Sequence, residues 1–127
     1  MAQHNELGKV GEEAAAKYLL LHGYEIRSLD WHCGHKDIDI VAEKPGLLVV
    51  VEVKTRSNEC FGNAVDAVDN QKIRNLVSAA DAYMRYYKLD TPVRFDIITV
   101  IGTEPPFEII HIEEAFTSPL WSSTSFF

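Results

Sequence analysis

Apolar and polar residues alternate along this chain with two different periods, and the period changes at turn-forming residues. Up to Gly23 the apolar residues recur every three or four positions, the spacing of one helix face, and Asn5 is a residue type that caps a helix start. Residues 37–43 alternate at every second position, as in a strand with one buried face, whereas 47–54 is a nearly continuous Val-rich run, as in a strand buried on both faces. We therefore expect helices at 5–22 and 68–88, strands at 24–29, 37–43, 47–54, 93–101 and 107–112, and loops at 30–36 and 55–63.

The order of these elements, αβββαββ, indicates a single α/β domain in which helices flank a mixed central sheet. The turn-forming run Lys44-Pro45-Gly46 joins two of the strands as a hairpin. In the first strand of that hairpin, alternation puts Ile38, Ile40 and Ala42 on one face and Asp37, Asp39 and Val41 on the other. A chain of 127 residues has room for one domain, which we expect at 1–116 with a C-terminal tail at 117–127.

Composition and charge narrow the class of protein. Apolar residues make up 46% and charged residues 24%, as in folded globular domains. The net charge of -7 argues against proteins that hold nucleic acid by positive charge alone, although 53–95 carries seven basic and five acidic residues. The apolar runs are too short to span a bilayer, the first residues lack a signal-peptide pattern, and two cysteines make no disulfide framework, so we expect a cytoplasmic protein that does not enter a membrane.

Glu52 and Lys54 interrupt the most apolar strand of the chain, and two such positions share one face of a strand. Burying these charges costs several kcal/mol unless they are paired or bind a ligand. Asp39, on the preceding strand of the hairpin, can converge on the same face. Two carboxylates suit a hard divalent cation, with the Val53 carbonyl as a further ligand, and Lys54 can orient or help deprotonate the water that attacks a phosphodiester. The alternative is a Glu52–Lys54 pair that only stabilises the hairpin, with Asp39 capping a turn.

The pattern Asp39…Glu52-Val53-Lys54 resembles the core of the PD-(D/E)XK nuclease superfamily. More specifically, the chain resembles the YraN-type uncharacterised protein family (Uncharacterised Protein Family 0102) in Asp37-Ile38-Asp39-Ile40-Val41-Ala42, Val51-Glu52-Val53-Lys54-Thr55-Arg56, the Gly- and Ala-containing first helix, Lys72 with Arg74, and Arg94-Phe95-Asp96. The resemblance implies a restriction-endonuclease-like three-layer fold and an endonuclease related to Holliday-junction resolvases, acting on DNA, including branched structures, with Mg²⁺ or Mn²⁺. Two departures stand out: Asp37 replaces the family's Glu, and Ile38 replaces the superfamily's Pro.

Several charged residues outside the core motif are further candidates. In resolvase-like relatives a first-helix Glu reaches the metal, and Glu12 matches that position; the alternative is a solvated glutamate like its neighbour Glu13. The candidate nucleic-acid-binding residues are Lys36, Arg56, Lys72 and Arg74. For Lys72 and Arg74 the alternative is a solvated helix face. Arg94 and Asp96 share one strand face, which favours a structural ion pair.

The run His32-Cys33-Gly34-His35 suggests a zinc site at first sight. Three donors within four residues do not easily close a tetrahedral site, and Cys60 and His111 do not supply a second ligand pair. We favour a loop that touches substrate, with Trp31 and His35 exposed.

Three functions remain after these arguments. The first is a metal-dependent endonuclease, which the convergence of Asp39, Glu52 and Lys54 favours. The second is a nucleic-acid-binding domain that keeps the nuclease fold without turnover, which the mildly basic segment 53–95 favours. The third is a structural or partner-binding domain with a buried ion pair. Many resolvase relatives are dimers, so the resemblance also raises a homodimer.

Overall fold

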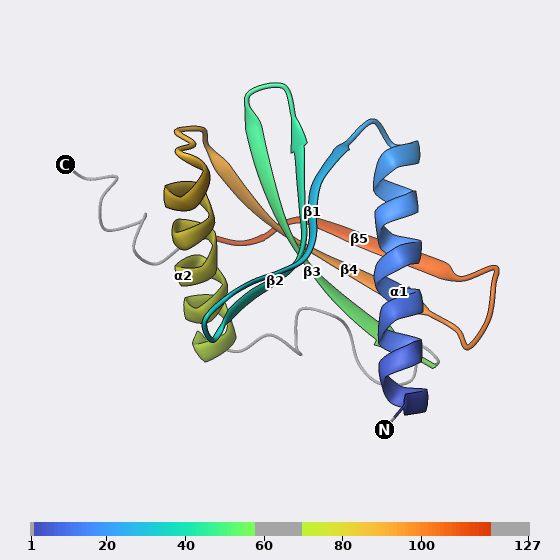
Figure 1. Ribbon diagram of the computed structural model, residues 1–127. Helices are drawn as coiled ribbons and strands as arrows, with labels where there is room; N and C mark the ends of the chain where they lie inside the picture. The colour runs from blue at the N-terminus through green and yellow to red at the C-terminus, as the bar shows by residue number, and fades with distance from the viewer. Residues whose placement is uncertain (1, 58–69, 118–127) are drawn as a thin grey trace.

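The computed structural model describes residues 2–57 and 70–117. A five-stranded sheet lies between two helices, α1 on one side and α2 on the other (Figure 1). The order αβββαββ is the predicted one, and the three-layer arrangement is that of a restriction-endonuclease-like fold. The elements are α1 (Ala2–Leu21), β1 (Glu25–Cys33), β2 (Lys36–Lys44), β3 (Leu47–Arg56), α2 (Asn70–Tyr87), β4 (Val93–Ile101) and β5 (Glu108–Phe116).

The strands are ordered β1-β2-β3-β4-β5 across the sheet. The central pair β3 and β4 is parallel, and the other three pairs are antiparallel, so the sheet is mixed as predicted. A parallel pair needs a crossover connection, and α2 lies within the connection between β3 and β4. This connection places α2 against the face of the sheet that carries the even-numbered side chains of β3.

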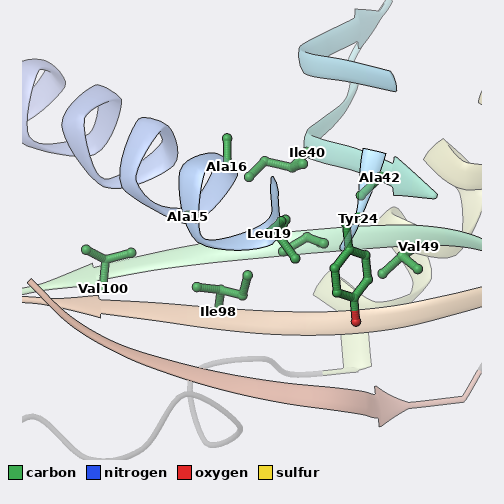
Figure 2. Packing of buried hydrophobic residues seen from close by; sticks show 10 residues of the cluster. Ala15, Ala16, Leu19, Tyr24, Ile40, Ala42, Val49, Ile98 and Val100 are labelled. Atoms are coloured by element: carbon green, nitrogen blue, oxygen red, sulfur yellow. The ribbon is translucent and has the colours of Figure 1, made fainter. Parts of the chain in front are cut away.

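Strand β3 separates two apolar cores. Val49 and Val51 pack with residues of α1 on one face, whereas Leu48 and Val50 pack with residues of α2 on the other. Figure 2 shows the α1 core, in which side chains of the helix meet those of β2, β3 and β4. Residues 48–51 are all buried, which confirms that this strand is covered on both faces.

The hairpin of β1 and β2 differs most from the prediction. The expected loop at 30–36 is the end of the hairpin, because Trp31 pairs with Ile38 and Cys33 with Lys36 across a turn at Gly34, whose φ is 62°. Figure 1 shows the hairpin bending so that its tip lies beside α2. Asp30, within β1, has a φ of 49°.

The predicted assignment of β2 side chains to the two faces of the sheet is also wrong in part. Ile38 packs in the α2 core, whereas Ile40 and Ala42 pack in the α1 core, so these three residues do not share one face. Strict alternation applies to a regular strand, and it is broken between Ile38 and Ile40, since these side chains belong to different cores.

Other differences concern element ends. Helix α1 already begins at Ala2, so Asn5 lies within the helix and does not cap it. Strand β3 continues to Arg56 and β5 to Phe116, beyond the predicted ends. Helix α2 ends at Tyr87, while residues 68–69 and 58–63 and the tail from 118 lie outside the described residues. No helix among the described residues is long and apolar enough to cross a membrane.

Candidate functional site

Glu52 lies in β3 immediately after the buried Val run, and only 6% of its surface is exposed. Lys54 follows two residues later, and its Nζ atom lies 3.1 Å from Glu52 Oε2. The two side chains therefore leave the strand on one face, as their spacing predicted. A carboxylate this deeply buried must be paired, and Lys54 provides one partner.

Helix α2 supplies a second cation to the same oxygen. Lys72 is in the first turn of the described helix, and its Nζ atom lies 3.2 Å from Glu52 Oε2. Lys72 is thus directed at the site carboxylate, although 40% of its side chain is exposed. Two ammonium groups thus satisfy this buried carboxylate oxygen.

Asp39 is joined to β3 by a hydrogen bond. The backbone N–H of Val53, between Glu52 and Lys54, donates to Asp39 Oδ2 at 2.9 Å. Burial raises the pKa of Asp39 to about 6, the negative charge of Glu52 adds to the rise, and the Val53 hydrogen bond and Lys72 oppose it. The sheet therefore holds two carboxyl groups close enough for each to feel the other's charge.

Helix α1 brings Glu12 to the same region. Gly11 contacts the Thr55 side chain of β3 so closely that a Cβ atom there would overlap Thr55 Oγ1. Burial, together with the negative charges of Asp39, Asp30, Glu52 and Asp37, raises the pKa of Glu12 to about 7. Glu12 is half-buried and electrostatically coupled to Asp39, unlike the exposed Glu13.

This donor set can be tested against a hard divalent cation. Among the described residues, no three His, Cys, Asp or Glu side chains together form a group that could hold a metal ion. A Mg²⁺ ion does not require three, because it keeps several of its waters and takes one or two carboxylates. Thr99, which pairs in register with Lys54, has a buried hydroxyl without a hydrogen-bond partner among the described residues. The crowded carboxyls of Asp39 and Glu12 fit a site that a hydrated cation completes.

Comparison with known proteins assigns the family. The model of the Uncharacterised protein family UPF0102 matches residues 11–100. A UPF0102 protein of Phocaeicola vulgatus is 58% identical over 121 residues, which covers 95% of this chain and 100% of the relative. UPF0102 proteins of Bacteroides thetaiotaomicron (59%; 95% and 100% covered) and Christiangramia forsetii (46%; 91% and 98% covered) are also similar. The chain belongs to this family.

The UPF0102 match spans every residue of the site described above, from Glu12 to Lys72. Among the described residues, the other three predicted nucleic-acid-binding residues form no ion pair with the Glu52 carboxylate. Lys36 is exposed at the start of β2, and the Arg56 guanidinium donates to the Thr55 carbonyl at 3.0 Å. Arg74 is exposed and donates to Gln71 of its own helix at 3.2 Å. The fold of this UPF0102 chain thus brings Lys72, and not Arg74, to Glu52.

The run His32-Cys33-Gly34-His35 forms the tip of the β1–β2 hairpin in the UPF0102 fold. Cys33 is an exposed free thiol, and His32 Nε2 lies 2.9 Å from Asp30 Oδ1. His35 is exposed as expected, but Trp31 is half-buried and contacts the Tyr83 ring edge-on with centroids 5.1 Å apart. The prediction of an exposed Trp31 is wrong because the bent hairpin packs this ring against α2.

The sequence predicted only part of a second polar cluster, which surrounds Asp96 of β4. Arg94 and Asp96 form the predicted ion pair, with hydrogen bonds of 2.9 and 2.8 Å. His111 Nε2 also lies 2.7 Å from Asp96, and Arg94 donates to the Tyr24 hydroxyl at 2.6 Å. His111 gave a signal in the sequence, because it interrupts the apolar run of β5. Its partner Asp96 was not predictable, because the register of β4 and β5 shifts between Phe95 and Ile97.

Proposed function

We propose that this chain is a divalent-metal-dependent endonuclease that hydrolyses phosphodiester bonds of DNA, branched DNA included. The observation that carries the proposal is the convergence of Asp39, Glu52 and Lys54 around the Val53 peptide. One hydrogen bond of 2.9 Å joins Asp39 to Val53, and one ion pair of 3.1 Å joins Glu52 to Lys54. A hairpin that needed only an ion pair for stability would gain nothing from Asp39 and Glu12, whose pKa values are raised by burial and neighbouring carboxylates. Carboxyl groups perturbed in this way are typical of functional sites.

Asp39, Glu52 and the Val53 carbonyl are the groups that would hold Mg²⁺ or Mn²⁺, with Glu12 as an outer partner. When bound, such an ion polarises a phosphate oxygen and lowers the pKa of a coordinated water. Two carboxylates and a carbonyl are oxygen ligands, which both cations prefer.

The lysines act on the substrate from the protein side. Lys54 can donate a hydrogen bond to the attacking water and hold it in line with the phosphorus atom. Lys72, from helix α2, can offset the negative charge that develops on the phosphate oxygens. Because Glu52 is nearly buried, these charges act in surroundings where electrostatic interactions are stronger than in water.

Cleavage of flap, four-way-junction and plasmid DNA with Mg²⁺ or Mn²⁺ tests the proposal. We expect Asp39→Asn, Glu52→Gln and Lys54→Met each to lower the cleavage rate by about 100-fold or more. Glu43→Gln is the matched control, because Glu43 lies at the other end of β2 in an ion pair of 3.7 Å with Arg27. We expect it to cleave like the unaltered protein.

The comparison of substrates and metals separates the competing functions. If the unaltered chain neither cleaves any of the three DNAs nor binds Mg²⁺ or Mn²⁺ by calorimetry, the endonuclease proposal is wrong. DNA binding with a salt dependence that Lys72→Ala weakens, but without cleavage, would support the nucleic-acid-binding domain instead.

A further inference from the structure

A cavity of about 350 Å³ lies between the tip of the β1–β2 hairpin and the first turns of α2. In Figure 1 the hairpin tip lies beside the lower end of α2, where the helix begins. The cavity is bounded by residues of both elements, the hairpin tip on one side and α2 on the other. Its lining comprises His35, Lys36, Asp37, Lys72, Asn75, Leu76 and Ser78.

Lys72 connects this cavity with the carboxylate site. The side chain lines the cavity, and its Nζ atom lies 3.2 Å from Glu52 Oε2. A DNA strand whose scissile phosphate meets Asp39 and Glu52 would therefore place its next nucleotide at the cavity.

The lining has the chemistry of a nucleotide site. Two ammonium groups, of Lys36 and Lys72, can bind a phosphate, and the Ser78 hydroxyl can hydrogen-bond to it. The Asn75 carbonyl oxygen accepts a hydrogen bond of 3.0 Å from Gln71, so the donor end of the amide is the one that meets a ligand.

Two further features favour a nucleotide over a bare anion. Asp37 is a carboxylate in the lining, which repels a free anion but accepts hydrogen bonds from the amino group of a base. A volume of about 350 Å³ also exceeds what a phosphate ion fills and lies at the lower end of small-ligand sites.

We propose that this cavity is a subsite that binds the phosphate and base of one nucleotide of a DNA strand, next to the bond to be cleaved. The inference rests on the proposed endonuclease function and adds to it the residues that position the strand. It assigns substrate contacts to Lys36, Asn75 and Ser78, none of which belongs to the metal site.

Metal-free titrations of the full chain with a single-stranded DNA pentamer, followed by amide NMR shifts, test the subsite independently of cleavage. We expect shifts at 35–37 and 75–78, and about tenfold weaker binding in Lys36→Ala and in Asn75→Ala. Both side chains are exposed, so neither substitution threatens the fold. Lys17→Ala is the matched control, because exposed Lys17 belongs to α1 on the opposite face of the sheet, and it should bind like the unaltered chain.

The outcomes distinguish the subsite from the proposed function. Equal pentamer affinity in Lys36→Ala, Asn75→Ala and Lys17→Ala, or shifts confined to other residues, would overturn the subsite. So would inorganic phosphate that saturates the same residues as tightly as the pentamer, since the cavity would then be a free-phosphate site. Asp39→Asn should bind the pentamer like the unaltered chain, because Asp39 does not line the cavity. If the unaltered chain binds the pentamer at these residues but cleaves no DNA, only the endonuclease proposal is overturned.

Discussion

At the scale of single residues, Glu12 and Asp39 are carboxyl groups that the fold keeps partly protonated near neutral pH. Burial and neighbouring carboxylates raise their pKa values to about 7 and about 6. The folded chain therefore binds these protons more tightly than the unfolded chain, whose carboxyls titrate near pH 4. Their contribution to the free energy of unfolding is therefore complete below about pH 4 and is lost as pH rises towards about 7.

We therefore expect Mg²⁺ or Mn²⁺ to raise the melting temperature more at pH 8 than at pH 5. At pH 8 both carboxyls are ionised, and a bound cation relieves their repulsion. In the metal-free protein, Glu12→Gln should raise the melting temperature at pH 8, because it removes one of the crowded charges. Glu13→Gln, the exposed neighbour, removes the same formal charge and should change little. Thermal melts with EDTA and with each metal measure all of this, and a metal response independent of pH would contradict it.

At the scale of elements, the position of Glu12 depends on how closely α1 approaches β3. A Cβ atom on Gly11 would overlap Thr55 Oγ1 and lie 3.3 Å from two further atoms of that side chain. We expect Gly11→Ala to destabilise the protein by about 1–2 kcal/mol, because the overlap outweighs the gain in helix propensity.

The same helix offers a matched control for this prediction. Nothing lies within 4 Å of a Cβ atom built on Gly8, so Gly8→Ala should stabilise the protein by about 0.5–1 kcal/mol. Adding Thr55→Ala to Gly11→Ala should restore part of the loss, since it removes the overlapping atoms. Urea unfolding of the four chains measures these differences, and a Gly11→Ala variant as stable as Gly8→Ala would disprove the close contact.

Most elements were predictable because their patterns are local. The Val run of β3, the period of α2 and the bounds of β4 follow from residues adjacent in the sequence. The end of the β1–β2 hairpin was predicted as a loop, because its last pairs join polar residues such as His32 and Cys33, which carry no alternating pattern. The face and spacing of Glu52 and Lys54 were predictable for the same local reason. The cavity was not, because its lining comes from two elements far apart in the sequence, the hairpin tip and α2.

At the scale of the whole molecule, lowering the pH has opposite effects on stability through two sets of carboxyl groups: Glu12 and Asp39 have raised pKa values, whereas Asp96 has a lowered one. The chain carries a net charge of -7 and has a pI of about 5.1, so acidification first lowers its overall repulsion. Over the same range Glu12 and Asp39 take up protons and stabilise the metal-free fold. We infer that the metal-free chain is most stable between about pH 4 and pH 6, below neutrality.

The acidic limit of that range is set by Asp96, which is 1% exposed. Burial opposes its ionisation, but hydrogen bonds from His111, Arg94 and the Glu114 amide outweigh burial and lower its pKa. Its contribution is present above about pH 4, where the unfolded carboxyl ionises, and is lost as pH falls through the lowered pKa. We expect the chain to unfold cooperatively in this acidic range.

Asp96→Asn should cost about 3–5 kcal/mol at pH 7, because it leaves the Arg94 guanidinium without its buried partner. Asp81→Asn removes the carboxylate from another Arg–Asp pair, at 3.1 Å between exposed side chains, and should cost less than about 1 kcal/mol. Asp96→Asn should also flatten the acid limb of the stability curve, since the group that titrates there is gone. Urea unfolding from pH 2 to pH 8 measures both effects, and an acid limb that persists unchanged in Asp96→Asn would assign the acid unfolding to other carboxyls.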